Sequence, residues 1–272
     1  MSRFSRNEAL FGAQGQALIE KAHVGICGLG GLGSHVAQQL AYLGVRHFLL
    51  IDFDVVTPSS LNRLIGAIEA DTEARTPKIE VGERTIKSVR SDAEVSKFSG
   101  RVADEGVTDF LSKADVVFGC LDSDVHRLEL LGAMASGGMP YFDLATDIIG
   151  EGGERVYGGR VILNQGEGCL VCLPEVLNQR AIAGERLNPS QREAHRRIYG
   201  IEADALAGTG PSVVSLNGVV ASLAVTECMA LLTGLRTSFT QLTYRGQQGV
   251  VAKSRDLGEP DCLYCTAFRA SR

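Results

Sequence analysis

Two short apolar runs, residues 24–27 and 48–51, frame a stretch in which the spacing of hydrophobic positions changes twice. Four glycines, all within residues 28–33, follow the first run, and apolar residues at helical spacing occupy residues 36–43. Unbroken apolar runs of this kind are typical of buried strands, so the pattern predicts a strand, a glycine turn, a helix and a parallel strand. In such a unit the N-terminus of the helix faces a phosphate group.

The alternation of strand and helix patterns continues along the first half of the chain. A continuous apolar run at 114–120 predicts a further buried strand, residues 125–136 a helix and residues 140–144 another strand. Strands that alternate with helices through about residue 145 predict an α/β fold with a doubly wound, Rossmann-like, mostly parallel sheet. Residues 1–23 show only a weak helical pattern and are interpreted as an N-terminal arm.

After residue 150 the pattern changes to short strands separated by glycines, which predicts a C-terminal antiparallel extension. Two more strand candidates lie at 239–244 and 250–253. The apolar segment 211–235 carries polar interruptions and is interpreted as a core helix, not a membrane span. The polar segment 174–208 is predicted to be a long mobile loop with a helical piece.

Composition narrows the class of protein. The chain has 272 residues, 44% hydrophobic and 22% charged, as expected of an ordinary globular protein. Its net charge of −5 gives no electrostatic footprint for nucleic acid or for an anionic membrane. The first residues contain no apolar core of signal-peptide length, so the protein is expected to be cytoplasmic. In that compartment its seven cysteines favour free thiols or a metal site over disulfides.

Four of the cysteines form two Cys-x-x-Cys pairs, Cys169 with Cys172 and Cys262 with Cys265. Each pair can supply two corners of a tetrahedron, and four thiolates make a closed structural zinc site. The alternatives are two unrelated surface turns or a redox pair. Because there are two pairs, zinc is favoured, and the metal would join the chain end to the region that follows the sheet.

The glycine turn predicts a nucleotide site. Gly28 allows the tight turn, Gly30 and its neighbour Gly31 lie where the backbone approaches phosphates, and Gly33 lets the helix pack closely on the strand. Asp52 follows nineteen residues after Gly33, where an acidic side chain can accept hydrogen bonds from ribose hydroxyls. This pattern fits a nicotinamide-dependent dehydrogenase about as well as an ATP site.

A second group of polar residues favours ATP. Asn62 and Arg63 lie in the loop that would pass the nucleotide, Lys78 begins a helical pattern and Asp122 follows a predicted buried strand. Phosphate chemistry needs cations on the phosphates and a carboxylate on Mg²⁺. A dehydrogenase has no evident use for this set.

These residues lie within motifs that resemble the ThiF/MoeB/HesA family, the bacterial relatives of ubiquitin-activating enzymes. The resemblance extends over nearly the whole chain and rests on several motifs in order: GLGGLG at 28–33, D-x-D-x-V at 52–56, S-x-L-N-R ending at Arg63, Pro77-Lys78, C-x-D-x-x-x-x-R at 120–127, and both cysteine pairs. The resemblance implies a homodimeric enzyme that binds Mg²⁺ and ATP and adenylates a carboxylate, usually the C-terminal glycine of a ubiquitin-like protein.

Roles for individual residues follow from the same resemblance. Asp52, with Asp54 nearby, would hold the ribose, and Asn62 and Arg63 would hold the phosphates. Lys78 would neutralise the β- and γ-phosphates of the leaving group, and Asp122 would ligate Mg²⁺. Arg6 falls where the family's N-terminal arginine enters the neighbouring subunit's site.

The chain also departs from the family pattern. Leu64 stands where Gln is usual and Ser123 where Asn is common. Many relatives have a cysteine at the position of Ala203, and here residues 173–226 contain none, so a thioester at the usual place is excluded. The loop 174–208 is longer than in compact relatives and is predicted to cover the acyl tail or dock the partner.

The expected organisation is a single adenylation domain over residues 1–272. A nucleotide-binding half, 24–148, would precede an acyl-substrate and zinc half, 149–272. Alternatives remain open: the same site could adenylate a small-molecule or peptide carboxylate, and the chain could be a non-catalytic nucleotide-binding scaffold.

Overall fold

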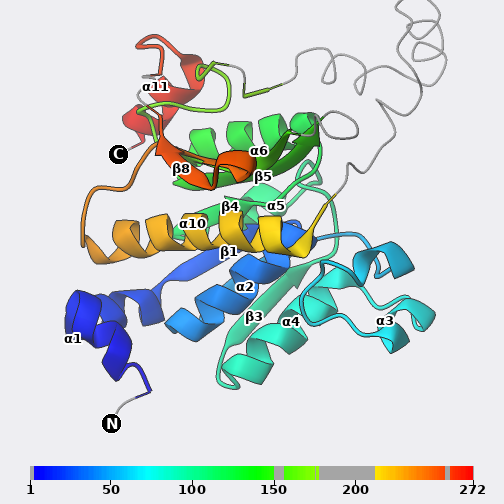
Figure 1. Cartoon of the computed structure of the whole chain (residues 1–272). Helices are drawn as coiled ribbons and strands as arrows, with labels where there is room; N and C mark the ends of the chain where they lie inside the picture. Colours follow the sequence, from blue (N-terminus) through cyan, green and yellow to red (C-terminus); the bar gives the residue numbers. More distant parts are fainter. Residues whose placement is uncertain (1–2, 150–155, 175, 178–211, 255–257, 272) are drawn as a thin grey trace, which may run out of the picture.

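The computed structural model describes residues 3–149, 156–174, 176–177, 212–254 and 258–271 (Figure 1). All strands of the described chain join in one eight-stranded sheet with the order β3-β2-β1-β4-β5-β6-β7-β8. The strands are β1 His23–Cys27, β2 His47–Ile51, β3 Glu94–Phe98, β4 Val116–Gly119, β5 Tyr141–Ile149, β6 Val156–Asn164, β7 Gln241–Arg245 and β8 Val250–Lys253.

The first five strands run parallel, and β6, β7 and β8 are added antiparallel to β5. The predicted fold class, a mostly parallel Rossmann-like sheet with an antiparallel C-terminal extension, is therefore confirmed. The proposed boundary at residue 148 falls inside β5, so the two predicted halves share one sheet.

Helices cover both faces of the sheet (Figure 1). They are α1 Ser5–Lys21, α2 Gly31–Leu43, α3 Glu69–Glu73, α4 Lys78–Val89, α5 Val107–Leu111, α6 Asp124–Gly137, α10 Val214–Thr233 and α11 Leu263–Ala270, with short 3-10 turns η1 Pro58–Ser60 and η3 Gly246–Gln248. One core cluster joins α1, α2, α4 and α10 to the sheet, and a second joins α5, α6 and α11 to the other face. Strand β8 and α11 lie at one end of the molecule, and α1, α3 and α4 at the other.

Residues 1–23, interpreted from the sequence as an arm with a weak helical pattern, contain a helix that packs on the fold. Residues Ser5–Lys21 form α1, a helix interrupted at Gly12, where φ is 73°. Buried Ile19 packs in the first core cluster, and the Gln16 amide donates a 3.1 Å hydrogen bond to the Leu43 carbonyl. The weak apolar periodicity hid this helix because part of its attachment is made by polar side chains.

Helix α10 is the one helix of the described chain that is long and apolar enough to cross a membrane, and 44% of its most apolar stretch is buried in the fold. It packs on α2 and against β5 and β6, which is the core position expected for it. Its buried Glu227 receives hydrogen bonds from Arg236 at 2.6 and 2.8 Å.

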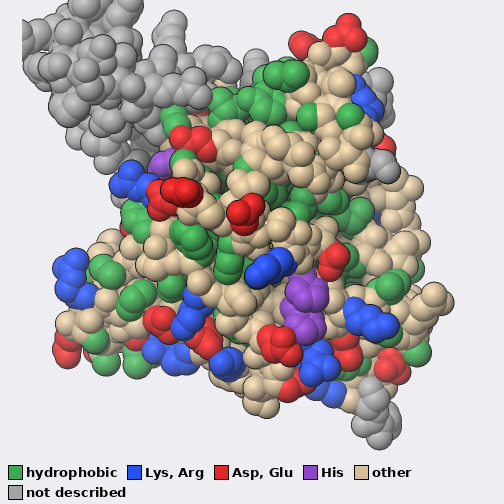
Figure 2. All heavy atoms as spheres, turned by 180° about the vertical axis from the view of Figure 1, so that it is seen from behind, with side chains coloured by type: hydrophobic (Ala, Val, Ile, Leu, Met, Phe, Trp, Pro, Cys, Tyr) green, Lys and Arg blue, Asp and Glu red, His purple; other side chains and the backbone are tan. Residues whose placement is uncertain are grey.

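On the face drawn in Figure 2, acidic and basic side chains are interspersed.

An ion pair fixes the loop that follows Arg63. The buried carboxylate of Asp71 accepts hydrogen bonds of 3.0 and 2.6 Å from Arg84, whose guanidinium also donates to the Gly66 carbonyl. These contacts, led by the hydrogen bonds from Arg84, lower the pKa of Asp71 to about 2. A carboxyl whose folded-state pKa is depressed stabilises the fold above its unfolded pKa, and that contribution disappears as the pH falls toward 2.

We expect Asp71→Asn to reduce the free energy of unfolding by about 1–2 kcal/mol at pH 7, because the ion pair is lost and Arg84 is partly exposed. The difference from the parent protein should shrink between pH 4 and pH 2. Urea unfolding at a series of pH values measures this, with Glu73→Gln, an exposed site in the same helix, as the control. A difference that does not change with pH would contradict the assignment.

Candidate active site

The glycine turn lies at the carboxyl ends of β1 and β4, where ligands bind in open α/β sheets. Gly28 has a φ of 89°, and its N–H donates to the Ile51 carbonyl at 2.8 Å. A Cβ atom on Gly28 would lie 2.6 Å from the Cys120 carbonyl oxygen, and one on Gly33 would lie 1.8 Å from the Gly28 carbonyl oxygen. The turn therefore requires glycine at both positions, because a side chain at either one would collide with backbone. At Gly33 this agrees with the close packing predicted from the sequence.

Asp52 binds the turn directly. Its carboxylate accepts hydrogen bonds from the backbone N–H of Leu29 at 2.6 Å and of Asp54 at 2.7 Å. Burial raises the pKa of Asp52, and the hydrogen bond from Leu29 and the charge of Lys78 act in the opposite direction. Asp52 as a residue is only 8% exposed, and its carboxylate holds the glycine turn against the end of β2. Its role toward ribose stays a prediction.

Lys78 begins α4 beside the same strand end. Its Nζ lies 2.7 Å from the Asp54 carboxylate, and its backbone N–H donates to the Asp54 carbonyl at 2.9 Å. A cation at a helix start is disfavoured by the helix dipole unless an anion lies nearby, and Asp54 supplies that anion. Since Lys78 also acts electrostatically on Asp52, the two carboxylates and the lysine form one charged group next to the turn.

Arg63 approaches the turn from the loop after η1. Its Cδ lies 3.4 Å from the position that a Cβ atom on Gly31 would occupy. The guanidinium donates to the Ser59 carbonyl and, at 3.1 Å, to the Asn62 side chain. Thus Arg63 and its neighbour Asn62 are close to the N-terminus of α2.

Asn217 of α10 also contacts the glycine turn, which sequence analysis missed. Its Nδ2 lies 2.2 Å from where a Cβ atom on Gly31 would stand, and its side chain is buried. It accepts a 3.0 Å hydrogen bond from the Thr146 hydroxyl and donates one to Ser212. The only signal for it in the sequence was a polar residue in an apolar helix.

Asp122 is exposed and lies in the loop that leaves β4. The start of this loop lies beside the glycine turn, because the Cys120 N–H donates to the Cys27 carbonyl at 2.8 Å. Arg127 holds this loop through a hydrogen bond to the Leu121 carbonyl. An exposed carboxylate at the carboxyl edge of the sheet is a ligand type that Mg²⁺ prefers, so Asp122 fits the predicted ion.

A buried ion pair anchors Arg127. Its Nη1 lies 2.7 and 2.8 Å from the two oxygens of Asp143, and donates to the Leu144 carbonyl at 3.0 Å. The Tyr141 hydroxyl donates to the same carboxylate at 2.9 Å. Although burial works to lower the pKa of Arg127, Asp143 leaves it raised overall. Sequence analysis found Arg127 within a motif but not its partner, Asp143.

Arg6 lies away from this site. It is exposed in the first turn of α1, next to Asn7, whose side chain donates to the Leu43 carbonyl. That carbonyl is at the end of α2 opposite the glycine turn, about 20 Å away for a helix of this length. Arg6 therefore does not join the site of its own chain, and its role in a second subunit stays a prediction.

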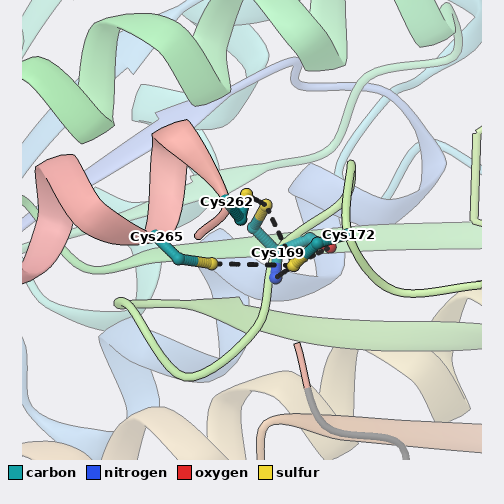
Figure 3. A group of neighbouring side chains, drawn as sticks. All are labelled: Cys169, Cys172, Cys262 and Cys265. Carbon is teal, nitrogen blue, oxygen red and sulfur yellow. Dashed lines mark hydrogen bonds between the residues drawn. The ribbon is translucent and has the colours of Figure 1, made fainter. Parts of the chain in front are cut away.

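The four predicted metal ligands come together near α11 (Figure 3). Their sulfur atoms are 3.7 Å apart for Cys169 and Cys172, 3.6 Å for Cys169 and Cys262, and 3.7 Å for Cys172 and Cys265. A tetrahedron with Zn–S bonds of about 2.3 Å has S···S edges of roughly 3.8 Å. The thiol geometry therefore fits zinc, as a site that joins the chain end to the segment after β6.

The sequence profile of the ThiF family matches residues 4–263. The chain belongs to the ThiF family. It is 26% identical to a molybdopterin-synthase adenylyltransferase of Salmonella typhimurium, over 97% of this chain and 96% of the relative. It is also 29% identical to the sulfur carrier protein ThiS adenylyltransferase of Escherichia coli, with 88% and 84% covered. The predicted family and enzyme class, adenylyltransferase, are confirmed.

Among solved structures, the ThiF-family chain resembles Escherichia coli MccB crystallised with ATP, with a TM-score of 0.71 and 20% sequence identity. The match covers 97% of this chain and 75% of MccB. This likeness shows a shared fold.

Two glycines of the turn, Gly33 and Gly30, offer a matched test of its packing. We expect Gly33→Ala to lower the free energy of unfolding by about 2 kcal/mol or more, because the added methyl group meets backbone. Gly30→Ala should change it by less than about 1 kcal/mol, since no atom lies within 4 Å of the new Cβ. Urea unfolding of both variants checks this, and equal losses would refute the close approach.

We expect one zinc ion per chain by elemental analysis, and removal by a chelator should lower the melting temperature. Cys262→Ser should lose most of the metal, because three thiolates bind zinc less tightly than four. Cys228→Ser, which changes a buried thiol of the other core cluster, should keep the metal and serves as the control. Full metal retention in Cys262→Ser would contradict a four-thiolate site.

Proposed function

We propose that this chain uses Mg²⁺ and ATP to adenylate a carboxylate, releasing pyrophosphate. The observation that carries the proposal is the convergence of Asp52, Arg63, Lys78 and Asp122, from four separate parts of the chain, on one edge of the sheet beside the glycine turn. This arrangement supports the proposal because it brings backbone N–H groups, two cations and carboxylates to one edge of the sheet, and these are the groups that bind a triphosphate and its metal ion.

In the proposed reaction an oxygen of the substrate carboxylate attacks the α-phosphorus, and the bond from that phosphorus to the bridging oxygen of the β-phosphate breaks. Pyrophosphate leaves with the electron pair, and no general base is needed because the nucleophile is already an anion. Arg63 and Lys78 stabilise the charge that develops on the phosphates. Asp122 would hold Mg²⁺, which supplies further charge neutralisation when bound. Lys78 would exchange part of its contact with Asp54 for phosphate oxygens.

We favour the C-terminal glycine of a ubiquitin-like carrier protein as the acyl substrate. Support comes from the relatives, which are named for molybdopterin synthase and for the sulfur carrier protein ThiS. The enzyme would stop at, or release, the acyl-adenylate, because the usual cysteine position is Ala203. That residue and most of the loop 174–208, proposed to cover the acyl tail or dock the carrier, lie outside the described residues. A cytoplasmic homodimer with Arg6 in the partner's site completes the proposal.

The direct test is ATP–pyrophosphate exchange with ubiquitin-like proteins from the same genome. Lys78→Ala and Asp122→Asn should each reduce exchange by about 100-fold or more, because each removes charge stabilisation at the triphosphate. Lys87→Ala, in the same helix, and Asp115→Asn, at the other end of β4, are matched controls and should stay near the parent rate.

Exchange that needs only a short peptide or a small carboxylic acid would favour the alternative substrate class with the same ATP chemistry. Binding of NAD in place of Mg-ATP, measured by calorimetry, would count against adenylation. Nucleotide binding without exchange for any carboxylate would indicate a scaffold.

A further inference from the structure

A pocket of about 430 Å³ opens over the antiparallel strands β6 and β7, on the side of the sheet that α6 covers further along. Its lining includes Asp147, Arg160, Val176, Gln241, Thr243 and Arg245. Arg160 is paired with Ala145 on β5 and Thr243 on β7, so it projects from the middle of the pocket floor. The volume lies in the range of sites that hold small ligands or peptide tails.

Arg160 is a mostly buried cation with only weak partners. Its side chain is 16% exposed, and its buried Nε has no hydrogen-bond partner within the described chain. The nearest carboxylates are 4.0 Å away at Asp143 and 3.7 Å away at Asp147, both too long for a hydrogen bond. Asp143 is already bound by Arg127 and Tyr141, and the Asp147 side chain is 65% exposed. A buried charge with such weak partners is costly unless a further anion joins it.

The pocket also holds an unsatisfied acceptor. Gln241 Oε1 is buried without a hydrogen-bond partner in the described part of the chain. Among the charged lining residues, Arg160 and Arg245 outnumber Asp147. A ligand that offers a carboxylate to Arg160 and an N–H group to Gln241 would satisfy both groups, and an acidic residue within a peptide offers both.

The strand register gives the distance from Arg160 to the proposed reaction site. On β5, Asp143 pairs with Gly119 of β4, and Ala145, two residues further, pairs with Arg160. Arg160 therefore stands level with the loop residue Leu121, two strand spacings away, which is about 10 Å. An extended chain covers that distance in about three residues.

We propose that Arg160 is a specificity-determining residue that binds an acidic side chain, Asp or Glu, about three residues from the carboxyl end of the acyl substrate, while Gln241 accepts a backbone N–H of the same tail. This inference rests on the proposed function, because it assumes that the tail leads from the pocket to the loop of Asp122. It names the substrate class more closely: a carrier or peptide tail with a negative charge at that position.

The test uses fluorescein-labelled decapeptides that end in X-Gly-Gly, where X is Glu, Gln or Lys. Binding to the full-length protein is followed by fluorescence polarisation in the presence of Mg²⁺ and a non-hydrolysable ATP analogue. We expect the Glu peptide to bind about tenfold more tightly than the Gln peptide, and the Lys peptide to bind most weakly. Arg160→Gln should remove the difference between Glu and Gln while leaving the affinity for the Gln peptide nearly unchanged.

Two further variants show whether the charge at this position is responsible. Arg160→Lys should keep a reduced preference for Glu. Lys253→Gln, which changes an exposed cation of the neighbouring strand β8 outside the pocket lining, should keep the full preference. Melting temperature and Mg-ATP binding confirm that each variant is folded. The inference is overturned if the parent protein binds the Glu and Gln peptides equally, if no peptide binds, or if Arg160→Gln retains the preference.

Failure of the proposed function would look different. A preference for Glu that depends on Arg160, in a protein that shows no ATP–pyrophosphate exchange, would support the binding role of Arg160 and contradict adenylation. Normal exchange with a carrier whose tail lacks an acidic residue, unaffected by Arg160→Gln, would overturn the inference and leave adenylation in place.

Discussion

The candidate site depends on one buried carboxylate, Asp52. Its oxygens accept the N–H groups of Leu29 and Asp54, so a single side chain fixes both the glycine turn and the chain leaving β2. Burial alone would favour the neutral acid, and the two N–H donors together with Lys78 act against that. Since Asp54 in turn binds Lys78, the start of α4 is tied to the same point. The cation and the helix N-terminus are thus held together before any nucleotide arrives, which lowers the cost of ordering them on binding.

A second buried carboxylate, Asp143, organises the other side of the site. It forms a short ion pair with Arg127, which reaches the Leu121 carbonyl and so positions the loop that carries Asp122. Buried ion pairs contribute little net stability, but loss of one partner leaves an uncompensated charge. We therefore interpret Arg127 and Asp143 as positioning residues. Their buried ion pair fixes the loop that holds the exposed carboxylate of Asp122 at the edge of the sheet.

Local sequence signals predicted the parts of the structure that depend on local chemistry. The glycine turn, the apolar strands and the two cysteine pairs each have a residue pattern imposed by their own geometry. The helix α1 and the contacts of Asn217 and Asp143 could not be predicted in this way. Asn217 and Gly31 are 186 positions apart in the sequence, and only the packing of α10 on α2 makes them neighbours. Asp143 is a single buried acidic residue inside β5, and its position is set by Arg127 on another element, so no periodic pattern in the sequence marks it.

Arg160 shows why the sheet register matters for specificity. Asp143 has four lone-pair positions, and Arg127 and Tyr141 already occupy its favourable directions at 2.7 to 2.9 Å. Arg160, two residues further along the β5–β6 ladder, is left with that carboxylate at 4.0 Å. The fold therefore satisfies Arg127, which positions the loop of Asp122, and leaves Arg160 short of an anion, facing a pocket. If a ligand carboxylate binds there, as we propose, it would replace only the weak contact with Asp147, and the cost of reorganisation would be low. Charge selection at the tail would then follow from the way Arg127 and Tyr141 occupy Asp143.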